Sequence, residues 1–331
     1  METKKRYKKG FTLGKFLPPH TGHLYMINEA AKQVDELTVL VCTINAEPIP
    51  GELRYSWMKA LLPGINVVHV TDEVPSYPHE SPDFWTIWTS LLRRETDADT
   101  GVFFSSETYG FEVAERLGID HVLIDLERTG IPVSGTAIRA NPFANWNFIP
   151  DCVKPYFIKK VVLTGPESTG KTTLARTLAE YFNTAWVEEY GRDYFIKKGG
   201  KLVPEDLLLI AKGQVALEDK KINEANKLLL CDTDLIVTGI WSEIYFESCP
   251  EELMRLSYTR EYAIHLLMDI DIPWEDDGTR EFPHLRQWHF NRIKEELDQR
   301  KLPYVIISGN FDERFLRAKK VVAELISFLD F

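Results

Sequence analysis

The sequence has 331 residues, of which 44% are hydrophobic and 27% are charged, and its formal net charge is −11. This composition excludes disordered, collagen-like and membrane-spanning classes, and the length allows two domains that each bury a core. The negative charge disfavours a nucleic-acid binder, because phosphate backbones select basic surfaces. We therefore expect a soluble, folded protein, and a small anionic ligand that binds in a local positive pocket stays compatible with this charge.

The four cysteines show neither C-x-x-C spacing nor a neighbouring histidine cluster, so we expect neither a disulfide framework nor a zinc site. The start, METKKRYKKGF, has five Lys or Arg in nine residues but no apolar run after them, which indicates a basic tail over residues 1–9. No apolar stretch is long enough to span a membrane. The sequence predicts a cytoplasmic protein with no membrane partner.

The first half alternates short apolar runs with longer amphipathic ones. FTLGKF and LTVLVCT read as strands, and in HLYMINEAAKQVDEL between them Leu24, Ile27, Ala31 and Val34 recur at helical spacing. Later segments repeat the alternation, with strands at 66–70, 102–106 and 121–126 and helices near 54–62, 83–95 and 110–117. This pattern predicts a parallel sheet covered by helices.

The alternation stops at RANPFANWNFIPDCVKPYF, where prolines and asparagines interrupt it, and restarts at FIKKVVLTG. We place a domain boundary near residue 155, which gives domains at 10–155 and 156–331. The second domain is expected to include a long helix at 204–226 and a closing helix at 312–329. The predicted fold class is α/β, with two doubly wound parallel-sheet domains.

GPESTGKT, from Gly165 to Thr172, matches the pattern G-x-x-x-x-G-K-[ST] between an apolar strand and a helix. The glycines let backbone N–H groups approach a phosphate, the lysine reaches the β- and γ-phosphates, and the hydroxyl coordinates Mg2+. We assign Lys171 to catalysis and Thr172 to the metal. The residues expected to bind ATP are Gly165, Pro166, Glu167, Ser168, Thr169, Gly170, Lys171, Thr172 and Thr173.

Two acidic segments follow predicted strands of this domain. KLLLCDTD places Asp232 near the expected metal, although Asp232 or Asp234 can instead cap the next helix. WVEEYGRDY offers Glu189 first and Asp193 second as the catalytic carboxylate that accepts the proton of an attacking hydroxyl. The alternative for this segment is a solvated acidic turn.

The segment DIPWEDDGTREFPHLRQWHF lacks periodicity and reads as a lid. Its Arg280 and Arg286 are expected to bind ATP by neutralising charge on the transferred phosphoryl group. Trp274 is a candidate for stacking on the substrate, the alternative being a core or rim position. Since no N-K-x-D guanine signature is present, a small-molecule kinase is favoured over a signalling GTPase.

The first half carries a second set of phosphate-binding motifs. GKFLPPHTGH joins the first strand to the first helix, and SGTAIR lies at the far end of the domain. Histidines three apart at a helix start lie on the same side, and the hydroxyls and arginine of SGTAIR suit a triphosphate. Expected ATP-binding residues are Gly14, Lys15, Phe16, His20, His23, Ser134, Gly135, Thr136 and Arg139.

Together these motifs resemble the Rossmann-like nucleotidyltransferase superfamily of adenylyl and cytidylyl transferases. The resemblance implies in-line attack of a substrate phosphate on the α-phosphorus of ATP, with release of pyrophosphate and no covalent enzyme intermediate. His20 and His23 then stabilise charge at the α-phosphate and the leaving group, and Lys15 and Arg139 assist. A metal ion is expected here too.

A nucleotidyltransferase followed by a P-loop kinase resembles the family of NadR-type bifunctional enzymes, also through SSETYG, SGTAIRANPFANW, EEYGRDY and DIPWEDDGTR. The resemblance implies that the kinase phosphorylates nicotinamide riboside with ATP and that the first domain adenylylates nicotinamide mononucleotide to NAD+. Trp85 and Trp88 are candidates to stack on nicotinamide, with core packing as the alternative, and Arg54 is a candidate substrate contact.

Some members of this family carry an N-terminal helix-turn-helix domain and repress transcription. About nine residues precede the first predicted strand, so we expect neither that domain nor a nucleic-acid partner. Homo-oligomerisation is compatible with the sequence. Two alternatives stay open: the same two reactions on another nucleoside or vitamin phosphate, and a nucleotide-sensing regulator without turnover.

Overall fold

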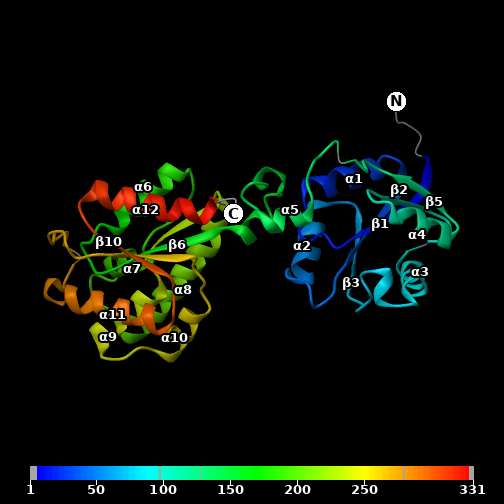
Figure 1. The fold of residues 1–331 in the computed structure, drawn as a ribbon. Helices are drawn as coiled ribbons and strands as arrows, with labels where there is room; N and C mark the ends of the chain where they lie inside the picture. The colour runs from blue at the N-terminus through cyan, green and yellow to red at the C-terminus, as the bar shows by residue number, and fades with distance from the viewer. Residues whose placement is uncertain (1–5, 97, 128, 279, 328–331) are drawn as a thin grey trace. The chain divides into compact units, whose positions relative to one another are not determined.

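The computed structural model describes residues 6–96, 98–127, 129–278 and 280–327. The chain divides into two compact units, one ending at Lys154 and the other beginning at Pro155. Each unit is an α/β domain with its own five-stranded sheet, and all strand pairs in both sheets are parallel (Figure 1). The expected fold class is therefore confirmed.

The sheet of the first unit has the strand order β3-β2-β1-β4-β5. Its strands are β1 (Tyr7–Gly14), β2 (Val34–Cys42), β3 (Asn66–Val70), β4 (Val102–Ser105) and β5 (Asp120–Leu123). Its helices are α1 (Thr21–Ala31), α2 (Gly51–Leu61), α3 (Phe84–Glu95), α4 (Tyr109–Leu117) and α5 (Gly135–Ala140), with the short 3-10 turns η1 (Pro78–Glu80), η2 (Trp146–Phe148) and, at the unit boundary, η3 (Lys154–Phe157).

Both faces of this sheet are covered, because successive residues of β2 enter two different cores. Val39 and Val41 pack with Ile27 of α1 and Met58 of α2. Leu40, on the opposite face, packs with Leu92 of α3 and Leu117 of α4. A strand that is buried on both faces needs a continuous apolar run, which VLVC at residues 39–42 provides.

Two sequence predictions at the edges of β1 and β2 were wrong. The strand begins at Tyr7, so residues 7–9 of the expected basic tail pair with the neighbouring strand. Val34, expected on the first helix, is the first residue of β2 and pairs with Tyr7. Its helical spacing from Ala31 was coincidental, since the helix ends at Ala31 and a buried β-branched residue suits a strand equally well.

The sheet of the second unit has the order β10-β9-β6-β8-β7. Its strands are β6 (Lys159–Thr164), β7 (Trp186–Val187), β8 (Leu228–Asp232), β9 (Ile264–Met268) and β10 (Tyr304–Ile307). Its helices are α6 (Lys171–Phe182), α7 (Tyr190–Lys197), α8 (Pro204–Lys221), α9 (Leu235–Phe246), α10 (Glu251–Tyr258), α11 (Arg286–Gln299) and α12 (Phe311–Ile326), with 3-10 turns η4 (Ile222–Glu224) and η5 (Pro283–Leu285).

Neighbouring residues of β9 likewise enter different cores, Leu266 with α6 and α12 and Leu267 with α9 and α11. In each sheet the central strand, β1 or β6, is where the strand order reverses. Ligands of open parallel sheets bind beyond the carboxyl end of the strands at such a point. The loops after β1 and β6 are therefore the places to look for sites.

No helix within the described ranges is both long and apolar enough to cross a membrane.

Candidate functional sites

The loop after β1 brings two histidine rings together. His20 is the N-cap residue of α1, and its Nδ1 accepts a hydrogen bond from the backbone N–H of His23 at 3.3 Å. The two rings are stacked, with 3.6 Å between their centroids. Phe16, buried and with a φ of +45°, packs edge-on against the His23 ring. The expected pairing of the histidines on one side is present.

The SGTAIR segment lies against the same loop. Ser134 caps α5 by accepting the N–H of Ala137 at 3.1 Å. A Cβ on Gly135 would lie 2.7 Å from the carbonyl oxygen of Leu17, so only glycine permits this approach. Arg139 donates to that carbonyl and, at 3.2 Å, to the Thr136 hydroxyl. Two segments more than 100 residues apart in sequence thus meet at one place.

These segments line a cavity of about 680 Å3 within the first unit. All nine residues expected to bind ATP here are among its lining residues: Gly14, Lys15, Phe16, His20, His23, Ser134, Gly135, Thr136 and Arg139. Trp85 and Trp88 line it too. Their packing is also structural, since Arg116 lies over the Trp85 ring at 4.9 Å and the Trp88 indole donates to the Pro75 carbonyl at 2.9 Å.

Arg54 does not fit its expected role as a substrate contact. Its side chain is fully buried and is absent from the cavity wall. The guanidinium donates to the carbonyls of Ile49 at 3.0 Å and Lys15 at 2.6 Å and pairs with the Glu47 carboxylate at 2.5 Å. The segment ELRYSWMKALL, which made Arg54 a candidate substrate contact, carries no sign that the guanidinium is buried against Glu47.

Glu47, which the sequence analysis missed, connects Arg54 to the cavity. Its other carboxylate oxygen pairs with the Lys15 ammonium at 3.0 Å, and Lys15 also donates to Ser76 at 2.9 Å. Burial alone would raise the pKa of Glu47, but Lys15, the Ile44 N–H and Arg54 hold that pKa below its usual value. Glu47 and Ser76 thereby hold the ammonium at the cavity, where it can also meet an anion.

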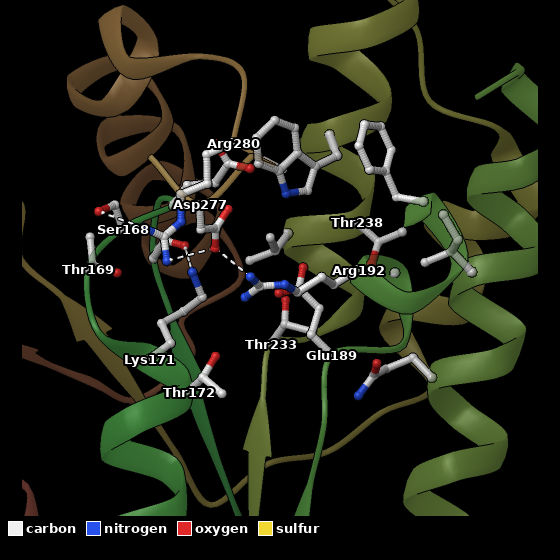
Figure 2. A pocket seen from close by; sticks show the side chains of 18 of the residues that line it. Ser168, Thr169, Lys171, Thr172, Glu189, Arg192, Thr233, Thr238, Asp277 and Arg280 are labelled. Carbon is white, nitrogen blue, oxygen red and sulfur yellow. Dashed lines mark hydrogen bonds and ion pairs between the residues drawn. The ribbon is translucent and has the colours of Figure 1, made fainter. Parts of the chain in front are cut away.

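The loop after β6 is a phosphate-binding loop in conformation as well as in sequence. Gly165 and Gly170 have φ values of +144° and +79°, and a Cβ on Gly165 would meet the Met268 carbonyl at 3.0 Å. Lys171 is the first residue of α6, and its ammonium donates to the carbonyls of Gly165 at 2.9 Å and Pro166 at 2.8 Å. The lysine therefore lies over its own loop (Figure 2).

This loop borders a cavity of about 370 Å3 in the second unit. Eight of the nine loop residues expected to bind ATP line it; Pro166 contributes its carbonyl to Lys171 but does not line the cavity.

Thr172 and Asp232 fit a magnesium ion. The Thr172 hydroxyl donates to Asp232 Oδ2 at 2.5 Å, and Asp232 Oδ1 is buried with no hydrogen-bond partner among the described residues. Burial raises the pKa of Asp232, with Lys171 and Thr172 opposing the rise. A carboxylate oxygen and a hydroxyl next to a phosphate loop are the donors that Mg2+ prefers. Asp234, in contrast, caps α9 through the Val237 N–H at 2.9 Å.

Of the two candidate proton acceptors, only Glu189 lines the cavity, and Asp193 is exposed on α7. Burial raises the pKa of Glu189 to about 7; Lys171 opposes this shift and Asp232 adds to it. A carboxyl group that titrates near neutral pH is suited to accept a proton at that pH. Figure 2 shows Glu189 beside Thr233, with Lys171 and Thr172 to its left.

Of the three lid residues expected at the site, one lines the cavity and two do not. Arg280 lines the cavity, donates to the Ser168 hydroxyl at 3.2 Å and pairs with Asp277 at 3.2 Å. Arg286 is not part of the wall; it donates to the carbonyls of Ile272 and Ser168 at 3.1 and 3.2 Å and so fixes the outside of the phosphate loop. Trp274, expected at the substrate, packs on Arg286 at 5.7 Å and does not line the cavity.

Several lining residues of this cavity were not identified from the sequence. Arg192 of α7 pairs with Asp277 of the lid across the cavity, as the dashed line in Figure 2 marks. Trp241 and Tyr245 of α9 line it as an aromatic pair with ring centroids 5.8 Å apart. The sequence contained a signal for these two aromatics, because their helix directly follows CDTD, the segment expected near the metal.

The two units define a class: an α/β protein that joins a nucleotidyltransferase-like domain to a P-loop domain. Residues 11–141 match the family model described as cytidylyltransferase-like, and residues 160–314 match that described as AAA domain.

Curated relatives identify the family. The chain is 32% identical over 349 residues to the "Trifunctional NAD biosynthesis/regulator protein NadR" of Escherichia coli (strain K12), with 97% of this chain and 84% of the relative covered. It is 31% identical to the protein of the same name from Salmonella typhimurium, with 98% and 85% covered. The chain belongs to the NadR family. A crystal structure of NadR protein in complex with NAD and AMP-PNP shares its fold, with a TM-score of 0.81 at 24% identity over 98% of this chain and 99% of that chain.

Proposed function

We propose that this protein is a bifunctional enzyme of NAD salvage. The second unit transfers the γ-phosphoryl group of ATP to nicotinamide riboside. The first unit then transfers the adenylyl group of another ATP to nicotinamide mononucleotide, with release of pyrophosphate and NAD+. The observation that carries the proposal is that one chain of the NadR family has two separate cavities, each with a phosphate-binding motif after its central strand.

In the kinase unit, Glu189 accepts the proton of the riboside hydroxyl as that oxygen attacks the γ-phosphorus. Lys171, released from its own loop carbonyls, binds the β- and γ-phosphates, and Arg280 neutralises the charge of the transferred group. Thr172 and Asp232 would hold Mg2+, which supplies further positive charge at the phosphates.

The Trp241 and Tyr245 rings, tilted by 33° to each other, give this cavity an aromatic wall for a pyridine ring. A nicotinamide ring that carries a positive charge is attracted to the faces of aromatic side chains. The Tyr245 hydroxyl is fixed by Glu281 at 2.8 Å, which places a carboxylate beside the same wall. This wall supports a cationic, aromatic nucleoside as substrate over a neutral sugar.

In the adenylyltransferase unit, the His20 and His23 rings face the α-phosphate and the leaving pyrophosphate. Lys15 and Arg139 bind the remaining phosphates. No side chain needs to form a covalent bond, because the substrate phosphate is itself the nucleophile, so positioning and charge stabilisation account for the catalysis. Trp85 and Trp88 offer the aromatic surface for nicotinamide in this cavity.

Two half-reactions test the proposal separately. Riboside with ATP and Mg2+ is expected to give the mononucleotide and ADP, and mononucleotide with ATP and Mg2+ to give NAD+ and pyrophosphate, with products separated by chromatography. If the kinase phosphorylates a different nucleoside faster than nicotinamide riboside, that nucleoside is the substrate and the assignment of nicotinamide riboside is wrong. Nucleotide binding without any product would exclude an enzyme.

A further inference from the structure

Glu189 lies on a segment that the sheet does little to hold. Strand β7 has only two residues, Trp186 and Val187, which pair with β8. The chain then leaves the sheet, and Glu189 becomes the N-cap residue of α7 without a hydrogen bond from its own side chain to that helix. A carboxylate that must meet a reacting hydroxyl needs support from elsewhere, because small misplacements of a catalytic group are costly to rate.

Gln214 of α8 gives that support to the backbone on both sides of Glu189. Its Oε1 accepts the N–H of Tyr190 at 2.8 Å, and its Nε2 donates to the carbonyl of Glu188 at 3.2 Å. A side-chain amide has the same donor and acceptor as a peptide group, so Gln214 pairs with residues 188–190 as a neighbouring strand would. Its side chain is only 1% exposed, so water does not replace these bonds.

The preceding residue of α8 adds an independent contact with the same segment. A Cβ on Gly213 would lie 2.2 Å from the Tyr190 ring, a distance that no side chain tolerates. Glycine is unfavourable inside a helix, and this close approach of the ring explains its presence. Gly213 and Gln214 together form the contact surface of α8 for residues 188–190.

We propose that Gln214 is a positioning residue for phosphoryl transfer, which holds residues 188–190 so that the Glu189 carboxylate faces the phosphate loop. The inference rests on the proposed function, in which Glu189 accepts the proton. Gln214 lines the cavity but acts through the backbone, and it needs no contact with the substrate.

The test is a double-mutant cycle of Gln214→Met and Glu189→Gln, measured as kcat for riboside phosphorylation. Methionine keeps the length of the side chain and removes both hydrogen bonds. We expect Gln214→Met to lower kcat about 10- to 100-fold and to leave the KM for ATP within about twofold, because the phosphate loop is not touched. In the Glu189→Gln background the same change should lower kcat less than about threefold.

Four controls make each outcome decisive. Gln299→Met removes a side-chain amide bond to Glu295 on α11, away from the cavity, and is expected to leave kcat unchanged. The rate of adenylyl transfer in the same preparation measures the amount of active enzyme. Binding of a non-hydrolysable ATP analogue, followed by thermal unfolding, measures whether the kinase unit is folded. Glu189→Gln alone tests the proposed base: if it keeps full activity, the base assignment fails, whatever Gln214 does.

A full, multiplicative loss of kcat in both backgrounds would show a general structural role and overturn the positioning inference, as would an unchanged kcat. If Gln214→Met does not fold, Gln214→Glu is the deciding variant. It keeps the acceptor for the Tyr190 N–H, loses the donor and adds a negative charge beside Glu189. Its kcat should fall and its pH profile should shift to higher pH, and an unchanged kcat and profile would contradict the inference.

Discussion

The hydroxyl of Thr172 donates a hydrogen bond to the Asp232 carboxylate, with 2.5 Å between the two oxygens. Thr172 is the second residue of α6, at the end of the phosphate-loop motif, and Asp232 ends the neighbouring strand β8, so the parallel pairing of β6 with β8 brings the two together. The second oxygen of Asp232 is buried without a partner in the described part of the chain. This pair is the basis for placing Mg2+ in the kinase unit.

Asp232→Asn is therefore expected to impair riboside phosphorylation selectively. The amide keeps the size of the side chain but removes the charge that would hold the metal, and we expect kcat to fall about 100-fold, the scale of losing one electrostatic contact in an active site. Initial rates over a Mg2+ titration measure the effect. Wild-type rates with a wild-type Mg2+ requirement would exclude Asp232 as a ligand, and adenylyl transfer serves as the unaffected reference.

Glu189 predicts the pH dependence of the kinase. Burial raises the pKa of its carboxyl to about 7, and only the ionised form accepts a proton. The kcat/KM for the riboside should therefore rise about tenfold per pH unit below that pKa and level off above it. Glu189→Gln should remove the rise, whereas Asp193→Asn, a change at an exposed position, should retain it. A flat profile for the wild type would contradict the assignment.

Arg54 is expected to determine stability and not substrate affinity. Arg54→Met leaves the Glu47 carboxylate largely buried without its guanidinium partner, and breaking a buried ion pair from one side costs about 3–5 kcal/mol of unfolding free energy. Urea titration with hydrogen exchange of peptides from the first unit measures this cost. Arg94→Met removes an exposed pair with Asp72 and is the matched control with little expected effect. Equal stabilities of the two variants would contradict the structure.

Trp241, which lines the kinase cavity, and not Trp274, which does not, is expected to contact the riboside. Trp241→Leu keeps apolar bulk but removes the aromatic face, so the KM for the riboside should rise about tenfold, which corresponds to about 1.4 kcal/mol. Trp274→Leu should leave that KM unchanged, because its ring packs on Arg286 outside the cavity. The KM for the riboside is measured for both variants by steady-state kinetics at saturating ATP. A raised KM for Trp274→Leu with an unchanged KM for Trp241→Leu would show that the lid tryptophan contacts the substrate.

The parts of both sites that the sequence predicted are local motifs, or motifs that a parallel sheet brings to one edge. Gly165 to Gly170 form a loop that needs glycine at both ends, and His20 and His23 are brought together by the first turn of α1. The grouping of Thr172 with Asp232 was also predictable, since strands of a parallel sheet end at the same edge.

The residues that were missed reach the cavities through tertiary packing. Gln214 lies on α8, far in sequence from the phosphate loop, so no local pattern connects it with the site. Trp241 lies in an apolar stretch of α9, and the sequence does not tell which of these apolar residues faces the cavity. Arg54 was wrongly predicted to contact the substrate, because arginine is usually exposed and nothing in the sequence indicates that this one is completely buried. Its partner, Glu47, lies seven residues earlier in a loop.

The central claim is that two independent sites act in series on one substrate. Lys171→Ala removes the phosphate-binding ammonium of the kinase, and His23→Ala removes an imidazole of the adenylyltransferase. Each variant is incubated alone with nicotinamide riboside, ATP and Mg2+, and then the two are mixed, with NAD+ measured over time. We predict no NAD+ from Lys171→Ala, accumulation of the mononucleotide with His23→Ala, and NAD+ from the mixture. NAD+ formation by either variant alone, or none from the mixture, would contradict the account.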